Sequence, residues 1–174
     1  MQQINSGLAK KASSKYKSTH TINKMVQKAI SNVAEGFIDD TPCIIYEGSE
    51  KEVEVGVYEI QIVDAIGRLI ENALKYSQDK TVFLHCVKNS SEDGSHSLVI
   101  RDFGLGVSDI RQLVVDDIFN QVDRSKLEQQ GCGFGLYIVN QFAKLNNVDF
   151  RLELPKEGPG VKAILDFKPA KEPS

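Results

Sequence analysis

The sequence predicts an α/β fold, a two-layer sandwich in which a mixed, mostly antiparallel sheet carries helices on one face. Two kinds of apolar pattern support this prediction. In the longer segments apolar residues recur at helical spacing, and in the shorter ones they either alternate with polar residues or form continuous runs, as in strands. Polar, glycine- or proline-containing stretches separate the two kinds. At 174 residues, 41% of them hydrophobic, the chain is long enough for one domain with a sizeable core.

The first predicted helix begins after Thr19 or Thr21, either of which can cap it, and continues to about Val33. An Asp-Asp-Thr-Pro sequence at 39–42 ends it. A short strand is expected next over 43–46, and a second strand or an extended lead-in over 53–57.

The helix pattern from about Val57 to Ser77 has two contrasting faces. Its apolar face gathers Ile62, Val63, Ile66, Leu69, Ile70, Ala73 and Leu74. Its opposite face gathers Asp64, Arg68, Glu71, Asn72 and Lys75. A carboxylate, a carboxamide and an ammonium within two turns can orient a hydroxyl, ligate a hard cation and neutralise phosphate. Taken alone, the same pattern is typical of an ordinary solvated helix face.

The second half of the chain completes the predicted sheet. Hairpins are expected from strands 81–88 and 97–101 around a loop at 89–94, and from strands 148–154 and 161–167 around 155–160. A polar stretch over 107–130 is expected to be a mobile loop, and 168–174 a disordered end. A helix over 133–145 should present Phe134, Ile138, Phe142 and Leu145 on one face.

Composition excludes several classes of protein. A net charge of -3 gives no electrostatic footprint for nucleic acid, and no apolar run reaches the ~18 residues of a membrane helix. The N-terminus lacks a signal-peptide core. Cys43, Cys86 and Cys132 are odd in number and widely spaced, which argues against a disulfide framework and a zinc site. We therefore expect a cytoplasmic chain that contacts neither nucleic acid nor membrane and is monomeric on its own.

Two glycine motifs follow the Asn72 helix. The first, Asp102-Phe103-Gly104-Leu105-Gly106, comes directly after an apolar strand, and the second, Gly131-Cys132-Gly133-Phe134-Gly135-Leu136, opens a helix. A buried carboxylate can accept a hydrogen bond from an exocyclic amine, and glycines let the backbone approach a flat ring. Backbone amides at a helix start suit phosphate. A capping Asp in a tight turn and a common glycine-rich helix start are the alternatives.

The fixed order of the Asn72 helix, Asp-x-Gly-x-Gly, Ile118-Phe119 and Gly-x-Gly-x-Gly-Leu resembles the ATP-binding catalytic domain of sensor histidine kinases. That family belongs to a superfamily shared with DNA gyrase, the heat-shock chaperone ATPases and the mismatch-repair ATPases. The resemblance covers about 18–169 and implies a Bergerat-type ATP-binding fold with ATP and Mg²⁺ as cofactors. It divides the chain into 1–17, a linker or the tail of an upstream helix, and 18–170, the catalytic domain.

The resemblance also implies roles for single residues near the base and the metal. Asp102 reads the adenine amino group, with Gly104 and Gly106 beside it. Asn72 is matched to the magnesium ligand, and Glu71 to the neighbouring acid/base position. Lys75 is matched to a phosphate contact and Tyr76 to packing near the base.

For the phosphate end, the resemblance implies a lid. Gly131, Gly133 and Gly135, within a motif that also holds Phe134 and Leu136, form its hinge. The body of the lid covers 120–130 and Phe119 anchors it. Arg124 lies where such lids often carry a basic residue aimed at phosphate, or is simply one more exposed arginine.

One position departs from the family pattern. The family usually has a second asparagine one turn before Asn72, and this chain has Arg68 there. A guanidinium cannot ligate a cation, but it can grip phosphate or pair with Asp64 or Glu71. The departure therefore bears on catalytic rate more than on nucleotide binding.

The resemblance implies a domain that binds Mg-ATP and transfers its γ-phosphoryl to a histidine, in two-component signalling. His20, His85 and His96 lack the setting of the family's acceptor, so the acceptor is expected in a dimerisation and phosphoacceptor domain outside this chain. That domain would lie in the same parent chain, which could be a membrane-bound sensor, or in a dimer mate, and a response regulator would receive the phosphate indirectly. Two alternatives stay open: a serine/threonine protein kinase of the anti-sigma-factor type, and a degenerate, nucleotide-gated interaction module.

Overall fold

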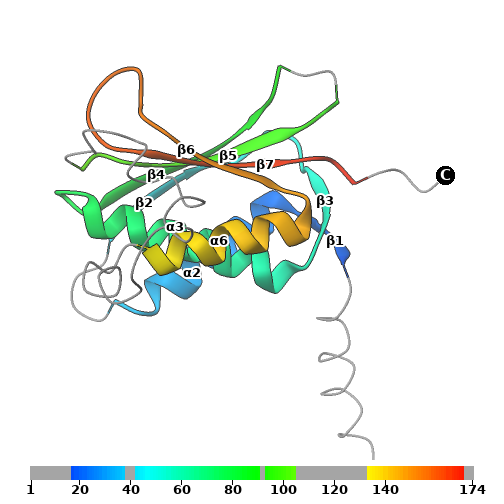
Figure 1. Cartoon of the computed structure of the whole chain (residues 1–174), viewed down its shortest axis with the longest axis horizontal. Helices are drawn as coiled ribbons and strands as arrows, with labels where there is room; N and C mark the ends of the chain where they lie inside the picture. The colour runs from blue at the N-terminus through cyan, green and yellow to red at the C-terminus, as the bar shows by residue number, and fades with distance from the viewer. Residues whose placement is uncertain (1–16, 38–41, 91–92, 105–132, 171–174) are drawn as a thin grey trace, which may run out of the picture.

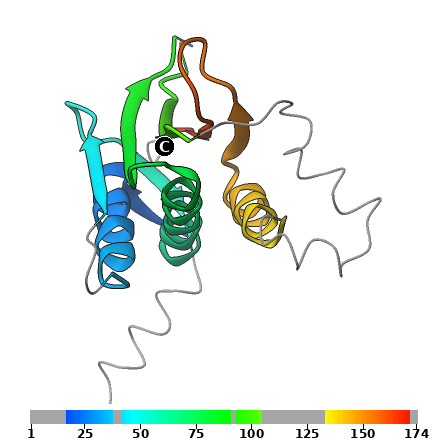
Figure 2. The ribbon, with the colours of Figure 1, turned by 90° about the vertical axis from the view of Figure 1, so that its left-hand side faces the viewer.

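The computed structural model describes residues 17–37, 42–90, 93–104 and 133–170, and within them the predicted two-layer α/β sandwich is confirmed. The elements are, in chain order, β1 (Ser18–Thr21), α2 (Ile22–Ala34), β2 (Cys43–Glu47), β3 (Glu54–Val57), α3 (Glu59–Tyr76), β4 (Thr81–Lys88), β5 (His96–Asp102), α6 (Gly133–Asn146), β6 (Asp149–Glu153) and β7 (Lys162–Phe167). In Figure 1 the helices α2, α3 and α6 all lie on one face of the main sheet, and Figure 2 shows them side by side, nearly end-on.

The main sheet has five strands in the order β2-β4-β5-β7-β6. The β2–β4 pair is parallel, and the other pairs are antiparallel, so the prediction of a mixed, mostly antiparallel sheet is confirmed. Because side chains alternate across a strand, Leu84, Leu98, Ile100 and Leu165 all point to the helix side of this sheet. The same alternation brings Asp102, at the end of β5, to that side.

Strand β1 is a difference from the prediction, in which this region held only the start of a helix. It pairs antiparallel with β3, and Thr21 then caps α2 by accepting a hydrogen bond from the Lys24 N–H at 3.4 Å. Ser-Thr-His-Thr contains no apolar residue, so periodicity could not reveal a strand that is held by backbone pairing. The Ala170 N–H donates to the Glu54 carbonyl of β3 at 2.8 Å, so the prediction of a disordered end from 168 is wrong at this position.

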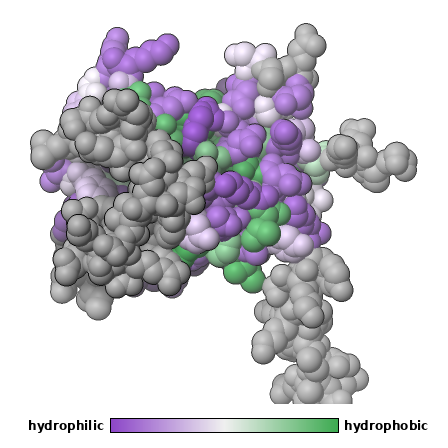
Figure 3. Space-filling model, in the orientation of Figure 1, coloured by the Kyte–Doolittle hydropathy of each residue, from purple (hydrophilic) through white to green (hydrophobic). Residues whose placement is uncertain are grey.

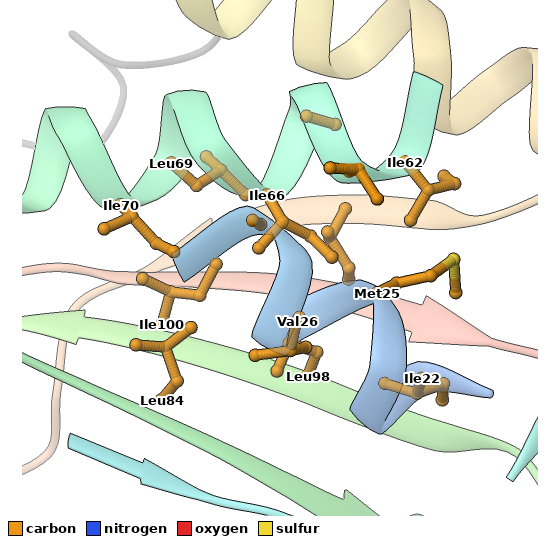
Figure 4. Close-up of a cluster of buried hydrophobic side chains, with 14 of the residues drawn as sticks. Ile22, Met25, Val26, Ile62, Ile66, Leu69, Ile70, Leu84, Leu98 and Ile100 are labelled. Carbon is orange, nitrogen blue, oxygen red and sulfur yellow. The ribbon is translucent and has the colours of Figure 1, made fainter. Parts of the chain in front are cut away.

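The core lies between α3 and the sheet. All seven residues of the predicted apolar face of α3 are buried, and Ile62, Ile66 and Ile70 have no exposed surface. Figure 4 shows the side chains of α3 converging with Met25 and Val26 of α2 above the apolar side chains of the strands. Burial of this face fixes the rotation of α3 about its own axis, and so fixes which side chains point away from the core.

The inward face of α6 differs from the prediction. Leu145 is 56% exposed, whereas Val139, Ala143 and Asn146 are buried and Phe142 is half-buried against the core. Because α6 carries apolar residues around most of its circumference, periodicity alone could not determine which side faces inward. The polar Asn146 helps to determine it, since its side chain accepts the Tyr58 N–H at 2.7 Å and donates to Gln61 Oε1 at 2.9 Å.

Figure 3 shows hydrophilic side chains over most of the described surface on this side of the molecule, with smaller hydrophobic patches over the helix layer. Within the described ranges, no helix has both the length and the apolar character needed to cross a membrane.

Because α3 is buried on one face and exposed on the other, substitutions on the two faces test the packing of the core. We expect Ile66→Ala to lower the free energy of unfolding by about 2–5 kcal/mol, because it leaves a cavity between α3 and the sheet. The matched control is Ile60→Ala, the same substitution in the same helix at a site that is 62% exposed, which should change it by about 0.5 kcal/mol or less. Urea unfolding of both variants measures the difference, and equal effects would contradict this description of α3.

Candidate functional site

Asp102 is a buried carboxylate at the end of β5, with 8% of its surface exposed. Its Oδ1 accepts the Gly104 N–H at 2.9 Å, and its own N–H donates to the Val161 carbonyl at 3.2 Å. Burial raises the pKa of the Asp102 carboxyl, while the Gly104 hydrogen bond and the nearby Arg101 charge oppose that rise. One hydrogen bond thus orients the carboxylate and the other anchors its main chain, in a setting where a polar partner is worth more than in water.

Two glycines are closely packed against Asp102. A Cβ on Gly104 would lie 2.1 Å from the carbonyl oxygen of Tyr76 and 3.1 Å from Asp102 Oδ1. A Cβ on Gly160 would lie 2.1 Å from the Asp102 carbonyl oxygen and 3.0 Å from Oδ1, and its φ of 101° already favours glycine. The end of α3, the end of β5 and the segment before β7 therefore meet around Asp102 with no space for a side chain.

Gly160 was not among the predicted site residues. Residues 155–160 were expected to form a hairpin turn, and a Gly-Pro-Gly sequence is ordinary in such turns. The available signal was the second glycine, which precedes the last strand directly; its contact with Asp102 depends on the β5–β7 pairing, which joins residues far apart in the sequence.

Asn72 lies against the start of α6. A Cβ on Gly135 would lie 3.6 Å from Asn72 Nδ2 and 4.0 Å from Oδ1, so the carboxamide faces the first turn of that helix. A helix start carries unpaired N–H groups and the positive end of the helix dipole, and both favour an anion. The carboxamide oxygen is also a hard ligand of the kind that Mg²⁺ takes together with phosphate and water oxygens. The predicted metal ligand and part of the predicted phosphate motif are therefore neighbours.

The other predicted residues of α3 lie at its surface. Glu71 and Lys75 are exposed, and Tyr76 is 46% exposed with its ring centroid 5.4 Å from Lys75 Nζ. The carbonyl of Tyr76 lies close to Gly104, two residues after Asp102. Arg68 binds Asp64 through Nε at 2.8 Å, so one of the predicted partners of this arginine is confirmed.

The predicted lid lies largely outside the described residues. Gly106, Phe119, Arg124 and Gly131 fall there, as does the side chain of Phe134. Gly133 begins α6, and Leu136 is half-buried against the core. The described part of the site therefore consists of Asp102 with its two glycines, the polar face of α3 and the first turn of α6.

The sequence model of a family described as "Histidine kinase-, DNA gyrase B-, and HSP90-like ATPase" matches residues 57–171, which is more than half of the chain. The matched region runs from the start of α3 to beyond β7 and includes every residue of the site described above. This chain therefore belongs to that ATPase family.

Among its sequence relatives are two kinases. Sensor histidine kinase GraS of Staphylococcus haemolyticus is 32% identical over 104 residues, which are 59% of this chain and 28% of the relative. Histidine protein kinase 1 of Candida albicans is 27% identical over 161 residues, which are 88% of this chain and 6% of the relative. The chain thus spans less than a third of the length of either curated relative.

Solved structures share the fold. The ATP binding domain of PrrB from Mycobacterium tuberculosis has a TM-score of 0.64 and 22% identity, over 89% of this chain and 98% of that one. Full-length ShkA, solved in complex with AMPPNP, has a TM-score of 0.68 and 17% identity, over 88% of this chain and 32% of that one.

The close packing around Asp102 predicts a strict requirement for glycine. We expect Gly160→Ala to lower the free energy of unfolding by at least about 1 kcal/mol, because the added Cβ collides with the Asp102 backbone and the φ is unfavourable. Gly56→Ala is the matched control, since a Cβ on Gly56 meets nothing within 4 Å, and its effect should stay within about 0.5 kcal/mol. Urea unfolding that gave the same result for both variants would contradict the packing described here.

Proposed function

We propose that this chain is the ATP-binding catalytic domain of a histidine kinase, which transfers the γ-phosphoryl of Mg-ATP to a histidine outside the chain. The observation that carries the proposal is Asp102, a buried carboxylate confined by two glycines beside the end of α3. The backbone packed at Gly104 and Gly160 fixes this carboxylate, and a fixed carboxylate oxygen can accept a hydrogen bond from an exocyclic amine. We assign this place to adenine.

The phosphate groups would lie along α3 towards the start of α6. Lys75 supplies an exposed positive charge near the end of α3, and Gly135 brings the first turn of α6 beside Asn72 without a side chain between them. Asn72 would hold Mg²⁺ through its carboxamide oxygen, and bound Mg²⁺ would neutralise phosphate charge and help to align the transferred group. The exposed carboxylate of Glu71, next to Asn72, would orient the attacking imidazole.

The phosphoacceptor would be a histidine of a dimerisation domain, in the same parent chain or in a dimer mate. A response regulator would then receive the phosphate, in a cytoplasmic two-component pathway. The names of the two kinase relatives support this proposal. Of the candidate acceptors in this chain, His85 lies in β4 with its pKa lowered by burial, and His96 lies in β5. Neither position suits an exposed nucleophile.

The Asp102 assignment gives a test of the nucleotide site. We expect Asp102→Asn to weaken the binding of ATP with Mg²⁺ by about tenfold or more, because an amide presents N–H donors where the adenine amine needs an acceptor. The fold should persist, since the amide oxygen can still accept the Gly104 N–H. Titration calorimetry measures the affinity, and thermal unfolding checks the fold.

The matched control is Asp149→Asn, which removes the same charge from an exposed position on β6 and should leave ATP affinity unchanged. Equal ATP affinity in the unsubstituted chain and in Asp102→Asn would overturn the adenine assignment. Absence of ATP binding in the unsubstituted chain would overturn the proposed function and favour the interaction-module alternative.

A further inference from the structure

A stripe of half-buried polar residues runs along the side of α3 that faces α6. Its members are Gln61, Asp64, Arg68 and Asn72, spaced three, four and four residues apart, so they share one side of the helix. The two ends of the stripe contact α6 directly: Gln61 binds Asn146 at 2.9 Å, and Asn72 lies beside Gly135. Arg68 therefore lies between them, on the side of α3 that carries the proposed phosphate site.

Arg68 and Asn72 lie one turn apart on the side of α3 that runs along α6. Asn72 and Gln61 are as many residues apart on α3 as Gly135 and Asn146 are on α6, so the helices run antiparallel and level with each other. Arg68 precedes Asn72 by one turn, about 6 Å along the axis. The bond to Asp64 holds the guanidinium on the side of Arg68 away from Asn72. Once released from Asp64, an extended arginine side chain is long enough to span that distance, so its guanidinium can reach the phosphates of a nucleotide held beside Asn72.

Asp64 holds Arg68 in a way that leaves the guanidinium usable. The bond runs from Nε to Oδ2, so it occupies one of the five N–H donors of the guanidinium. Both side chains are partly exposed, at 35% for Arg68 and 43% for Asp64, and an ion pair so exposed contributes little to stability. A phosphate group, which carries more negative charge than a carboxylate, can therefore displace Asp64 as the partner of Arg68.

We infer that Arg68 exchanges Asp64 for a phosphate group of the bound nucleotide, and that it thereby lowers the dependence of ATP binding on Mg²⁺. This inference rests on the proposed function. Its physical basis is that an arginine placed one turn from Asn72 can supply part of the positive charge that Mg²⁺ otherwise supplies. The same charge repels a cation at Asn72, so the affinity for ATP changes less when Mg²⁺ is removed.

The test compares ATP affinity with Mg²⁺ and with a chelator, by titration calorimetry on the whole chain. Arg68→Gln should weaken ATP binding about tenfold without Mg²⁺ and by less than that with Mg²⁺, because the metal then compensates for the missing charge. Adenosine, which has no phosphate, should bind both proteins equally. Arg68→Lys keeps the positive charge but loses the planar set of N–H donors of the guanidinium. Without Mg²⁺, its ATP affinity should lie between those of Arg68→Gln and the unsubstituted chain.

Arg151→Gln is the matched control, because it removes an arginine that also pairs with carboxylates but lies on β6, away from the helix layer. It should leave ATP affinity unchanged under both conditions. If Arg68→Gln and the unsubstituted chain bound ATP equally well in the presence of the chelator, this inference alone would be overturned. It would also be overturned if Arg68→Gln weakened the binding of adenosine as much as the binding of ATP. Failure of the unsubstituted chain to bind ATP would instead overturn the proposed function.

Discussion

The burial of one face of α3 is the constraint on which the rest of the structure depends. Its isoleucines fill the space above the sheet and pack against α2, so the helix can neither rotate nor slide without opening a cavity. The opposite face must then carry whatever the site requires. Asn72 faces α6, Glu71 and Lys75 face solvent, and the carbonyl of Tyr76 meets the Asp102 loop. A single helix thus connects the core to both ends of the proposed nucleotide site.

The second constraint is the close approach of three backbone segments around Asp102. The end of α3, the end of β5 and the segment before β7 are far apart in the sequence, and the sheet and core bring them together. Glycine at 104 and 160 is the condition for this approach. The burial that results raises the pKa of Asp102, so the fold bears the cost of a desolvated carboxylate. A buried polar group that is retained at such a cost is typical of a binding site.

The sequence predicted the structure most reliably where residues close together in the chain determine it. The apolar face of α3 could be read from helical periodicity, and the position of Asp102 at a strand end could be read from an apolar run followed by glycines. It failed where long-range pairing decides the outcome. Strand β1 exists because β3 lies beside it, and Gly160 matters because β7 pairs with β5. Leu145 is exposed because a buried asparagine, which no hydrophobic pattern can identify, binds the start of α3.

The nucleotide site is tested most directly by the amide shifts that adenosine and ATP with Mg²⁺ cause in the ¹⁵N-labelled chain. We expect adenosine to shift the amides of Gly104, Gly160 and Val161, and ATP to shift these and also the amides of Gly135 and Leu136. Shifts centred on Val99 and Ile164, which lie on the sheet face away from the helices, would contradict this expectation. So would identical shifts from both ligands.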